Sequence, residues 1–478
     1  MTNHTHDQKG GRPTGGRLFC AAAVVPFALV CWVFFQFFYP YHFYYQEQNQ
    51  LFLWSADYLC AYFDAPGGLA RLAGDCLTQL YYYQYAGALI LTLAIAAIGL
   101  LLCKAMRGFR AGRVVAAATG LLAMALVAVS HFSLSYKLFS TVSVMGWAAV
   151  LWLVSLARGW RLRVAAAACL LPAAWWLLGL PQAKALKRPD FILERDFAVA
   201  NEYYFGNHDR VIGMVEGAPE RTREMLFFYN LVRAQRGELP DHLLAFTPTE
   251  LGTFYKIGPE TPRQTIINMN ELYWALGDMT FTERAAMMAC VFAPNNRNVR
   301  MVKRLAECNL VSGDTLAAEK YLRLLDKTLA YRKWAGRVRS HGKDIYRAKM
   351  QMVNTHDTIT VSDNAHFLMM QLLDANPANT VALDYILCST LLLKDIDGFK
   401  RDYDRYCTDT GRHRPKPLYQ EALCIWLAGT DAPQEEWQRY VQSPDVVQRF
   451  REYGRRRGDA RFKGTYWYYF DKEKAPEI

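Results

Sequence analysis

Long apolar runs alternate with short basic stretches over the first third of the chain, and this pattern predicts membrane-spanning helices. A helix needs about 20 mostly apolar residues to span the hydrocarbon core of a bilayer. Five runs meet or approach that length: residues 18–39, 86–103, 114–132, 138–157 and 163–180. The last run is short in apolar residues and carries Pro172, so the pattern leaves the fifth span open. The alternative for the whole block, residues 18–180, is a set of buried helices in a soluble protein.

Lysine and arginine flank these runs unevenly, which predicts an orientation. Cytoplasmic loops of membrane proteins carry an excess of these residues. The tail and the loops after the second and fourth runs hold ten of them: Lys9, Arg12, Arg17, Lys104, Arg107, Arg110, Arg113, Arg158, Arg161 and Arg163. The other two loops offer only Arg71 and Lys137. We therefore expect a disordered cytoplasmic tail over residues 1–17. Five spans would place residues 181–478 outside the cytoplasmic (inner) membrane, in the periplasm, whereas four would place them inside.

The predicted outer loop, residues 40–83, is rich in aromatic residues. Pro66-Gly67-Gly68 divides it into two pieces whose apolar residues recur at near-helical spacing, and we expect both pieces to lie at the membrane interface. His42 and the polar run Gln46–Gln50 precede them. Within that run Glu47 is the candidate acid or base, because a carboxylate in a low-dielectric place can have a raised pKa. The alternative is that Glu47 caps a helix and lies in water.

Beyond residue 180 the apolar spacing becomes that of amphipathic helices about 12–15 residues long, joined by short turns. Gly277-Asp278 and Gly313-Asp314 lie 36 residues apart, each between two helical stretches, and Gly206-Asn207 and Lys394-Asp395 occupy equivalent turns. Asn376-Pro377 and Pro294 are expected to close helices at the matching end. The predicted fold class is thus all-α: about five transmembrane helices followed by an α-solenoid of helix pairs.

Three segments fit the helical array poorly. Phe246–Pro262 carries many helix breakers and is predicted to be a loop, and Met350–Val361 is predicted to be a short strand or an extended linker. The C-terminal region holds seven basic residues and then the aromatic run Tyr466–Phe470. This region is either a patch for anionic lipid or glycan, or a solvated helix followed by aromatic residues that pack back onto the array.

Charge and cysteine content exclude several classes of protein. The chain of 478 residues has a formal net charge of +11. Through residue 180 there are 12 Lys and Arg against 5 Asp and Glu, and beyond it 43 against 39, so the basic excess is mostly a topology signal and no nucleic-acid partner is expected. The 11 cysteines form no CxxC pair and no zinc-like spacing with histidine. Cys60 and Cys76 share the outer loop and either pair or remain free thiols.

Standard catalytic motifs are missing from the sequence. There is no GxSxG, HExxH, GxxxxGK[ST] or GxGxxG motif, so no metal and no cofactor is predicted. His131, at the end of a predicted span, is expected to be a hydrogen-bonding anchor. The predicted spans contain no acidic residue, which argues against an ion pathway. Whether the protein is an enzyme stays open, because an active site built from one loop carboxylate requires none of these motifs.

The helix pairs resemble tetratricopeptide repeats, whose period is near 34 residues. The residues that fall on the packing positions of three units are Gly277, Ala289 and Pro294; Leu305, Ala306, Gly313, Ala318 and Tyr321; and Leu383, Ile386 and Leu387. Taken as a whole, QEQNQLF, PGGLA and LTQLYYY followed by a repeat domain ending in TYWYYF, the chain resembles a family of uncharacterised bacterial inner-membrane proteins. That resemblance implies an architecture and no activity.

A second likeness concerns the outer loop. Integral-membrane glycosyltransferases that use lipid-linked sugars place an acidic residue just past their first span, where Glu47 stands here, with Asp57 as the poorer candidate. Such enzymes have more spans than this chain. Two hypotheses follow: a membrane-anchored scaffold whose repeat surface binds a protein or peptide, or a glycan- or lipid-modifying enzyme with Glu47 as its acid/base. A polar cleft lined by Glu47 favours the enzyme, whereas a loop packed shut favours the scaffold.

Overall fold

The computed structural model describes residues 14–64, 66–157, 159–174, 184–246, 251, 260–293, 297–353, 362, 364–411 and 414–475, and every regular element in these ranges is a helix. The all-helical class is therefore confirmed. The chain forms two compact units. The first unit is Met1–Glu194 with the short segment Lys327–Arg332, and the second unit is Arg195–Asp326 with Lys333–Ile478.

Within its described residues the first unit contains four helices that are long and apolar enough to cross a membrane: Phe19–Phe38, Ala86–Gly108, Arg113–Ser130 and Leu138–Ser155. These correspond to the first four predicted spans. The elements of the unit are α1 (Thr14–Val33), a π-helical turn (Phe34–Phe38), α2 (Tyr41–Gln48), α3 (Ala56–Cys60), α4 (Gly68–Thr78), α5 (Ala86–Gly108), α6 (Arg113–Ser130), α7 (Leu138–Ser155) and α8 (Trp160–Ala174), with 3₁₀ turns at Ala61–Asp64 and Gln79–Tyr82.

The fifth predicted span is only partly described. Helix α8 covers Trp160–Ala174, and residues 175–180 of the prediction lie outside the described residues. Of the predicted tail, residues 1–13 also lie outside them, and residues 14–17 belong to α1.

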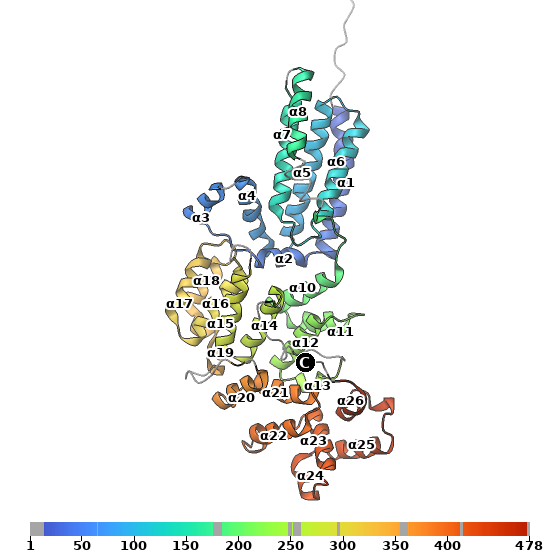
Figure 1. The fold of residues 1–478 in the computed structure, drawn as a ribbon, viewed down its shortest axis with the longest axis vertical. Coiled ribbons are helices and arrows are strands. Elements are labelled where there is room, and N and C mark those ends of the chain that lie inside the picture. Colours follow the sequence, from blue (N-terminus) through green and yellow to red (C-terminus); the bar gives the residue numbers. More distant parts are fainter. Residues whose placement is uncertain are drawn as a thin grey trace, which may run out of the picture. The chain divides into compact units, whose positions relative to one another are not determined.

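Helix α5 is the centre of the bundle, because α1, α6 and α7 all pack against it (Figure 1). Leu91, Ile95 and Ile98 form its fully buried stripe, at the i, i+4, i+7 spacing of one helix face. A Cβ atom at Gly120 of α6 would lie 2.9 Å from the carbonyl oxygen of Gly99 on α5. Small residues thus let these two helices approach closely, as is common for helices in lipid.

The outer loop is helical in part. Helix α4 confirms the second predicted piece, but the first is wrong for Leu51–Ser55, which has no helical conformation. Helix α4 packs against α7. A Cβ at Gly74 would lie 2.4 Å from the Cα of Phe139, so the two backbones are in close contact. Periodicity alone did not reveal that α4 has a protein neighbour on this face.

The second unit is a set of helices of mostly 7–14 residues. They are α10 (Phe191–Tyr204, whose first turn belongs to the first unit), α11 (His208–Glu216), α12 (Arg223–Gln235), α13 (Leu239–His242), α14 (Arg263–Leu276), α15 (Met279–Val291), α16 (Val299–Ser312), α17 (Thr315–Asp326), α18 (Arg332–Ile345), α19 (Arg347–Met352), α20 (Ala365–Ala375), α21 (Thr380–Leu392), α22 (Ile396–Tyr403, continued by a π turn, Asp404–Thr408), α23 (Pro417–Gly429), α24 (Gln434–Tyr440), α25 (Pro444–Arg455), a 3₁₀ turn (Ala460–Phe462) and α26 (Tyr466–Lys472).

The predicted turns join these helices by one mechanism. Gly277 and Gly313 take the left-handed conformation (φ +83° and +89°) that ends a helix, and the aspartate that follows each caps the next one. Asp278 Oδ1 accepts the backbone N–H of Phe281 at 2.9 Å, and Asp314 Oδ1 accepts that of Ala317 at 2.9 Å. Helices α14, α15, α16 and α17 pack as successive neighbours. Helices therefore end and begin at the two predicted Gly-Asp turns.

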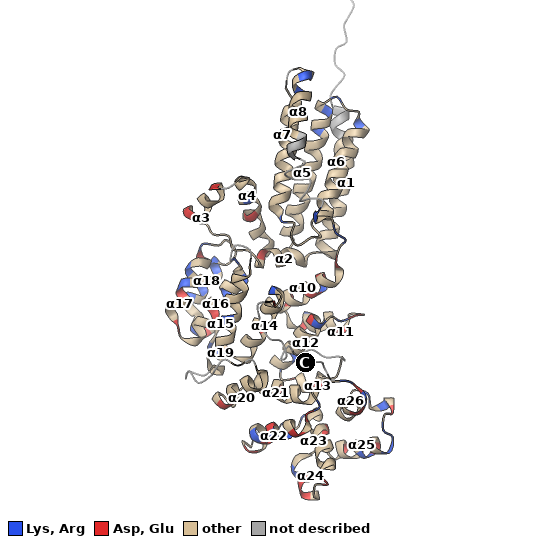
Figure 2. Ribbon diagram, viewed as in Figure 1, with Lys and Arg blue, Asp and Glu red and all other residues tan. Residues whose placement is uncertain are grey.

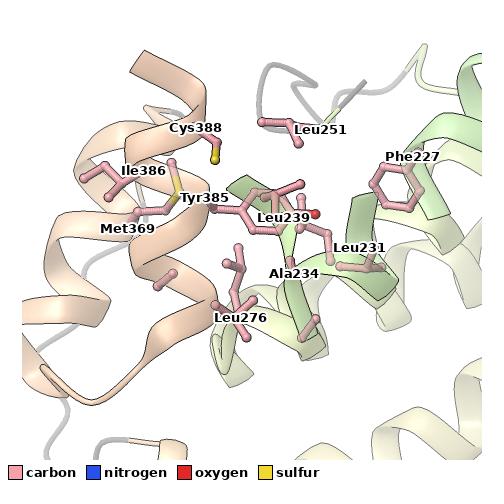
Figure 3. Close-up of a cluster of buried hydrophobic side chains, with 14 of the residues drawn as sticks. Phe227, Leu231, Ala234, Leu239, Leu251, Leu276, Met369, Tyr385, Ile386 and Cys388 are labelled. Carbon is pink, nitrogen blue, oxygen red and sulfur yellow. The ribbon is translucent and has the colours of Figure 1, made fainter. Parts of the chain in front are cut away.

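The order of packing departs from a linear array. Helix α21 is buried from Val381 to Leu392 and contacts α12, α13 and α14 as well as its sequence neighbours α20 and α22. Figure 3 shows this core, where the buried Tyr385 of α21 points toward Leu239. In a simple solenoid each repeat contacts only its neighbours. The solenoid as a whole is therefore not confirmed.

The poorly fitting segments have mixed outcomes. Most of Phe246–Pro262 and residues 354–361 lie outside the described residues, as does Pro294. The start of Met350–Val361 is helical as part of α19, so the prediction is wrong for those residues. Tyr466, Trp467 and Tyr469 of the aromatic run are buried. Tyr466 and Tyr469 donate their hydroxyls to the carbonyls of Leu391 and Leu392, at 2.8 and 2.7 Å. This supports the packing alternative for the C-terminal aromatic residues.

Candidate functional site

Glu47, the residue singled out by sequence, lies near the end of α2 and is only 4% exposed. Its Oε2 accepts a hydrogen bond from the hydroxyl of Tyr331 at 3.2 Å. Tyr331 belongs to the segment Lys327–Arg332, which packs within the first unit although it is about 280 residues away in sequence. Glu47 therefore does not lie in water, which rejects the exposed cap predicted as its alternative role.

The segment Lys327–Arg332 is fixed around Glu47 by several contacts. The carbonyl of Lys327 accepts the backbone N–H of Trp54 at 2.7 Å, and the N–H of Leu329 is donated to Gln79 Oε1 at 3.3 Å. The rings of Tyr331 and Tyr82 meet edge to face with centroids 5.2 Å apart. A substrate would have to displace Tyr331 to reach this carboxylate oxygen.

The other outer-loop candidates are not joined to Glu47. Asp57 is exposed on the short helix α3. Cys60 and Cys76 are both free thiols, so the pairing alternative is not realised. Within the described residues no group of three or more His, Cys, Asp or Glu side chains could hold a metal ion.

A second polar centre on α2 was not predicted. His42, at the start of the helix, is fully buried, and the carboxyl of Glu194 accepts the backbone N–H groups of Tyr41 and His42 at 2.5 and 3.2 Å. The Nδ1 of His42 lies 3.9 Å from Glu194 Oε2. Glu194 thus caps the N-terminus of α2 from the first turn of α10. No local signal in the sequence links residues that lie 152 positions apart.

His131 lies next to this centre. Its Nε2 forms a 2.7 Å hydrogen bond with Thr141 Oγ1 of α7, so its predicted role as an anchor is confirmed. Burial lowers the pKa of His131 to about 3. Burial also lowers the pKa of His42 to about 3, with a smaller contribution from His131. Both imidazoles are therefore neutral at physiological pH.

The carboxyl group of Glu194 is also mostly neutral at physiological pH. Burial raises its pKa to about 8, although the N–H groups of Tyr41 and His42 pull it the other way. A carboxyl group with a pKa near neutrality, beside an imidazole, is typical of sites that exchange protons. The arrangement can bind and release one proton.

The second unit holds its own buried polar centre, made of charged groups. Arg300 and Arg304 of α16 each donate to one oxygen of Glu271 on α14, at 2.8 and 2.5 Å, and all three side chains are buried. The guanidinium of Arg304 also lies over the ring of Trp274, with its carbon 4.4 Å from the ring centroid. Lys349 donates to the carbonyl of Trp274 at 2.7 Å. The role of this network is to join α14, α16 and α19.

These features define the class: an all-helical, membrane-associated protein with a helical bundle and a second helical unit. Residues 17–183 and 180–473 match a family of unknown function (DUF6057), and the chain belongs to that family. The uncharacterised family inferred from the sequence is confirmed by this match. No curated protein and no solved structure matches the chain.

Proposed function

We propose that this protein is a membrane-anchored scaffold that holds a protein or peptide partner on the helix pairs of its second unit, outside the cytoplasmic membrane. The observation that carries the choice is the closed surroundings of Glu47. An enzyme built on this carboxylate needs an open polar cleft, whereas the Tyr331 hydroxyl bonds it and the side chain is buried.

One observation supports a cytoplasmic location for the basic end of the bundle. Arg163 donates to the carbonyls of Gly108 and Ala157 at 2.7 and 2.8 Å, so the basic loops after α5 and α7 lie at the same end of the first unit. Figure 2 shows Lys and Arg gathered where α5, α6, α7 and α8 meet these loops. By the positive-inside rule this end faces the cytoplasm.

Contacts at the opposite end of the first unit help to decide whether the chain crosses the membrane a fifth time. Glu194 bonds Tyr41 and His42, which follow α1, and α1 runs antiparallel to α5, with Cys20 beside Cys103. Residue 163 therefore lies at the basic end of the bundle and residue 194 at the opposite end. This supports a fifth crossing between them, with Arg195 and the residues after it outside.

A reporter pair at the C-terminus tests this topology. Alkaline phosphatase fused after residue 478 is expected to be active in cells, and green fluorescent protein fused at the same place is expected to be dark. Fluorescent cells without phosphatase activity would place the second unit in the cytoplasm and contradict the topology.

The partner surface is proposed on α15 and α17, the helices that follow the two Gly-Asp turns of the tetratricopeptide-like pairs. Leu316 is 85% exposed, and Met287 and Val291 are exposed large apolar residues on α15. The hydroxyl of Tyr321 lies 3.7 Å from the sulfur of Met287, so α15 and α17 contribute to one surface. Apolar residues clustered on a surface are typical of protein interaction sites.

A photo-crosslinking amino acid at Leu316 in the full-length protein tests the surface in cells. A discrete adduct is expected, and Val291→Glu should remove it. The matched control is the same crosslinker at Phe367 of α20, which is also an exposed apolar residue. An adduct that forms equally at both positions, or that survives Val291→Glu, would contradict a specific partner site.

The alternative, that the protein is an enzyme, requires the Glu47 carboxylate to be essential. If Glu47 were the acid or base, Glu47→Gln would abolish the effect of the protein on the cell envelope while its abundance stayed unchanged. Tyr331→Phe would leave that effect in place, because it removes a hydrogen bond and keeps the carboxylate. Full complementation by Glu47→Gln would end the alternative and leave the scaffold.

A further inference from the structure

Glu194 and His42 bring a carboxyl group and an imidazole close together in a buried site. The carboxyl oxygen Oε2 lies 3.9 Å from His42 Nδ1, and the imidazole is fully buried. Among the described residues neither ring nitrogen of His42 has a hydrogen-bond partner. An unpaired polar atom in a buried place costs free energy, so such a group calls for a specific explanation.

Aromatic rings lie against the histidine of this pair. The rings of Phe35 and Phe43 lie against His42, with centroids 5.8 and 4.0 Å away. The other titratable groups close to the pair are His131 and Tyr39, and Asp190 in turn lies close to Tyr39. Within the described ranges no Lys or Arg side chain forms an ion pair with Glu194. The site therefore offers no counter-charge to an ionised carboxylate.

We propose that Glu194 and His42 form a proton-binding site that latches the first turn of α10 to the N-terminus of α2. The proton is held on the Glu194 carboxyl group: on release its O–H bond breaks, the proton passes to water, and the electron pair stays on the carboxylate. The site is neutral with the proton bound and carries one negative charge without it, while His42 stays neutral.

Loss of this proton leaves a net negative charge in surroundings that cannot solvate it. Burial of an unpaired charge is strongly unfavourable, so the ionised carboxylate favours a conformation in which it reaches water. Leaving the site breaks its two hydrogen bonds to α2. Glu194 is the last residue of the first unit before the second unit begins, so the proton controls the stretch of chain that joins the units.

The direction of the pH effect follows from the pKa values. The pKa of Glu194 is raised from 4.5 to about 8, so the closed latch loses stability as pH rises from 4.5 to 8. The pKa values of His42 and His131 are lowered from 6.5 to about 3, so these two groups do not affect the latch above pH 6.5 and oppose its closed form as pH falls below 6.5. The latch is thus most stable near pH 6.5. Between pH 6.5 and 8 the closed population falls about thirty-fold relative to the open one, tenfold for each pH unit.

Hydrogen–deuterium exchange of the full-length protein in detergent tests the proposal. After correction for intrinsic rates, amides of residues 41–48 are expected to exchange faster at pH 8 than at pH 6.5. Glu194→Gln, which keeps the shape and cannot ionise, should remove that difference. The matched control is Glu47→Gln on the same helix, which should keep it. A pH effect that survives in Glu194→Gln, or that is absent from the wild-type protein, would overturn the proposal.

Infrared difference spectroscopy gives a second readout, which detects the proton itself. A protonated carboxyl C=O band at pH 6.5 that disappears by pH 9 is the expected result. Selective ¹³C labelling assigns the band to glutamate, and its reduction in Glu194→Gln but not in Glu421→Gln assigns it to Glu194, since burial also raises the pKa of Glu421 to about 7. A spectrum with no protonated glutamate band at pH 6.5 would show that Glu194 is ionised and would overturn the proton site.

Discussion

Two buried glutamates, one in each unit, have opposite protonation preferences. Burial alone would raise the pKa of Glu271, but Arg304 and Arg300 outweigh it and hold that pKa below its ordinary value. Burial raises the pKa of Glu194 to about 8, because two backbone N–H groups offset the loss of hydration only in part. The same side chain is therefore an ion in one unit and an acid in the other.

The contrast between Glu271 and Glu194 shows two ways in which a protein can bury a carboxyl group. At Glu271 the second unit buries a charge and pairs it with two guanidinium groups, whereas at Glu194 the first unit buries a carboxyl group that stays neutral. A paired charge costs most when its partner is removed, because an uncompensated charge remains. A neutral group costs most when the pH forces it to ionise. The two units should thus respond to different perturbations.

The largest expected effect comes from Glu271→Gln. This change leaves Arg300 and Arg304 buried without their shared carboxylate, so we expect the second unit to lose about 3–5 kcal/mol of stability. Hydrogen–deuterium exchange of α14 and α16 measures the loss locally, because slow amides report the free energy of opening. Unchanged protection in these helices would mean that the network contributes little.

The next effect is the pH response of the first unit. Between pH 6.5 and 8 the ionisation of Glu194 should cost about 2 kcal/mol, or 1.4 kcal/mol per pH unit over that interval. The thermal midpoint of the first unit should fall accordingly, and Glu194→Gln should give a flat profile over the same range. The lowered pKa of Glu271 gives the opposite sign: its contribution is lost as pH falls below 4.5.

A smaller effect is expected at the hydrogen bond between Tyr331 and Glu47. Tyr331→Phe removes one neutral donor to a buried acceptor, and we expect a loss of about 1 kcal/mol. A double-mutant cycle with Glu47→Gln isolates the coupling of the pair. Tyr83→Phe, at an exposed tyrosine of the same unit, is the control and should change little. A coupling energy near zero would mean that the two side chains do not stabilise each other.

The smallest effect is expected on the surface of the second unit. Arg405 and Asp374 form a pair 2.8 Å apart, but both side chains are about half exposed. Asp374→Asn should cost less than about 1 kcal/mol, since solvent and salt screen such pairs. Comparing it with Glu271→Gln in the same assay separates the effect of burial from that of charge pairing. Equal losses at the two sites would show that burial does not decide the outcome.

Sequence reasoning succeeded where the signal is local. The apolar run 86–103 contains the core of α5, and Gly277-Asp278 and Gly313-Asp314 ended one helix and began the next, as predicted. The prediction failed at Leu51–Ser55, where apolar spacing resembled a helix and the backbone is extended. A few apolar residues at helical spacing are too little evidence for a helix when no second turn supports them.

The candidate site shows the same division. The sequence pointed to Glu47 and to His42 as polar groups near the end of the first span, and both lie on α2. Their partners were not predictable, because Tyr331 is 284 positions from Glu47 and Glu194 is 152 positions from His42. No periodicity or turn motif reports such a pairing.

The sequence by itself determined the helical class, four spans of sufficient length, and the turns that cap successive helices. These properties depend on residues within one or two turns of each other, which is the range over which hydrogen-bonding and apolar periodicity act. Only the tertiary structure decided which carboxylates are buried, which residues pair with them and whether they hold a proton. Those outcomes depend on the local dielectric and on charges brought together through space, which a linear order of residues does not specify.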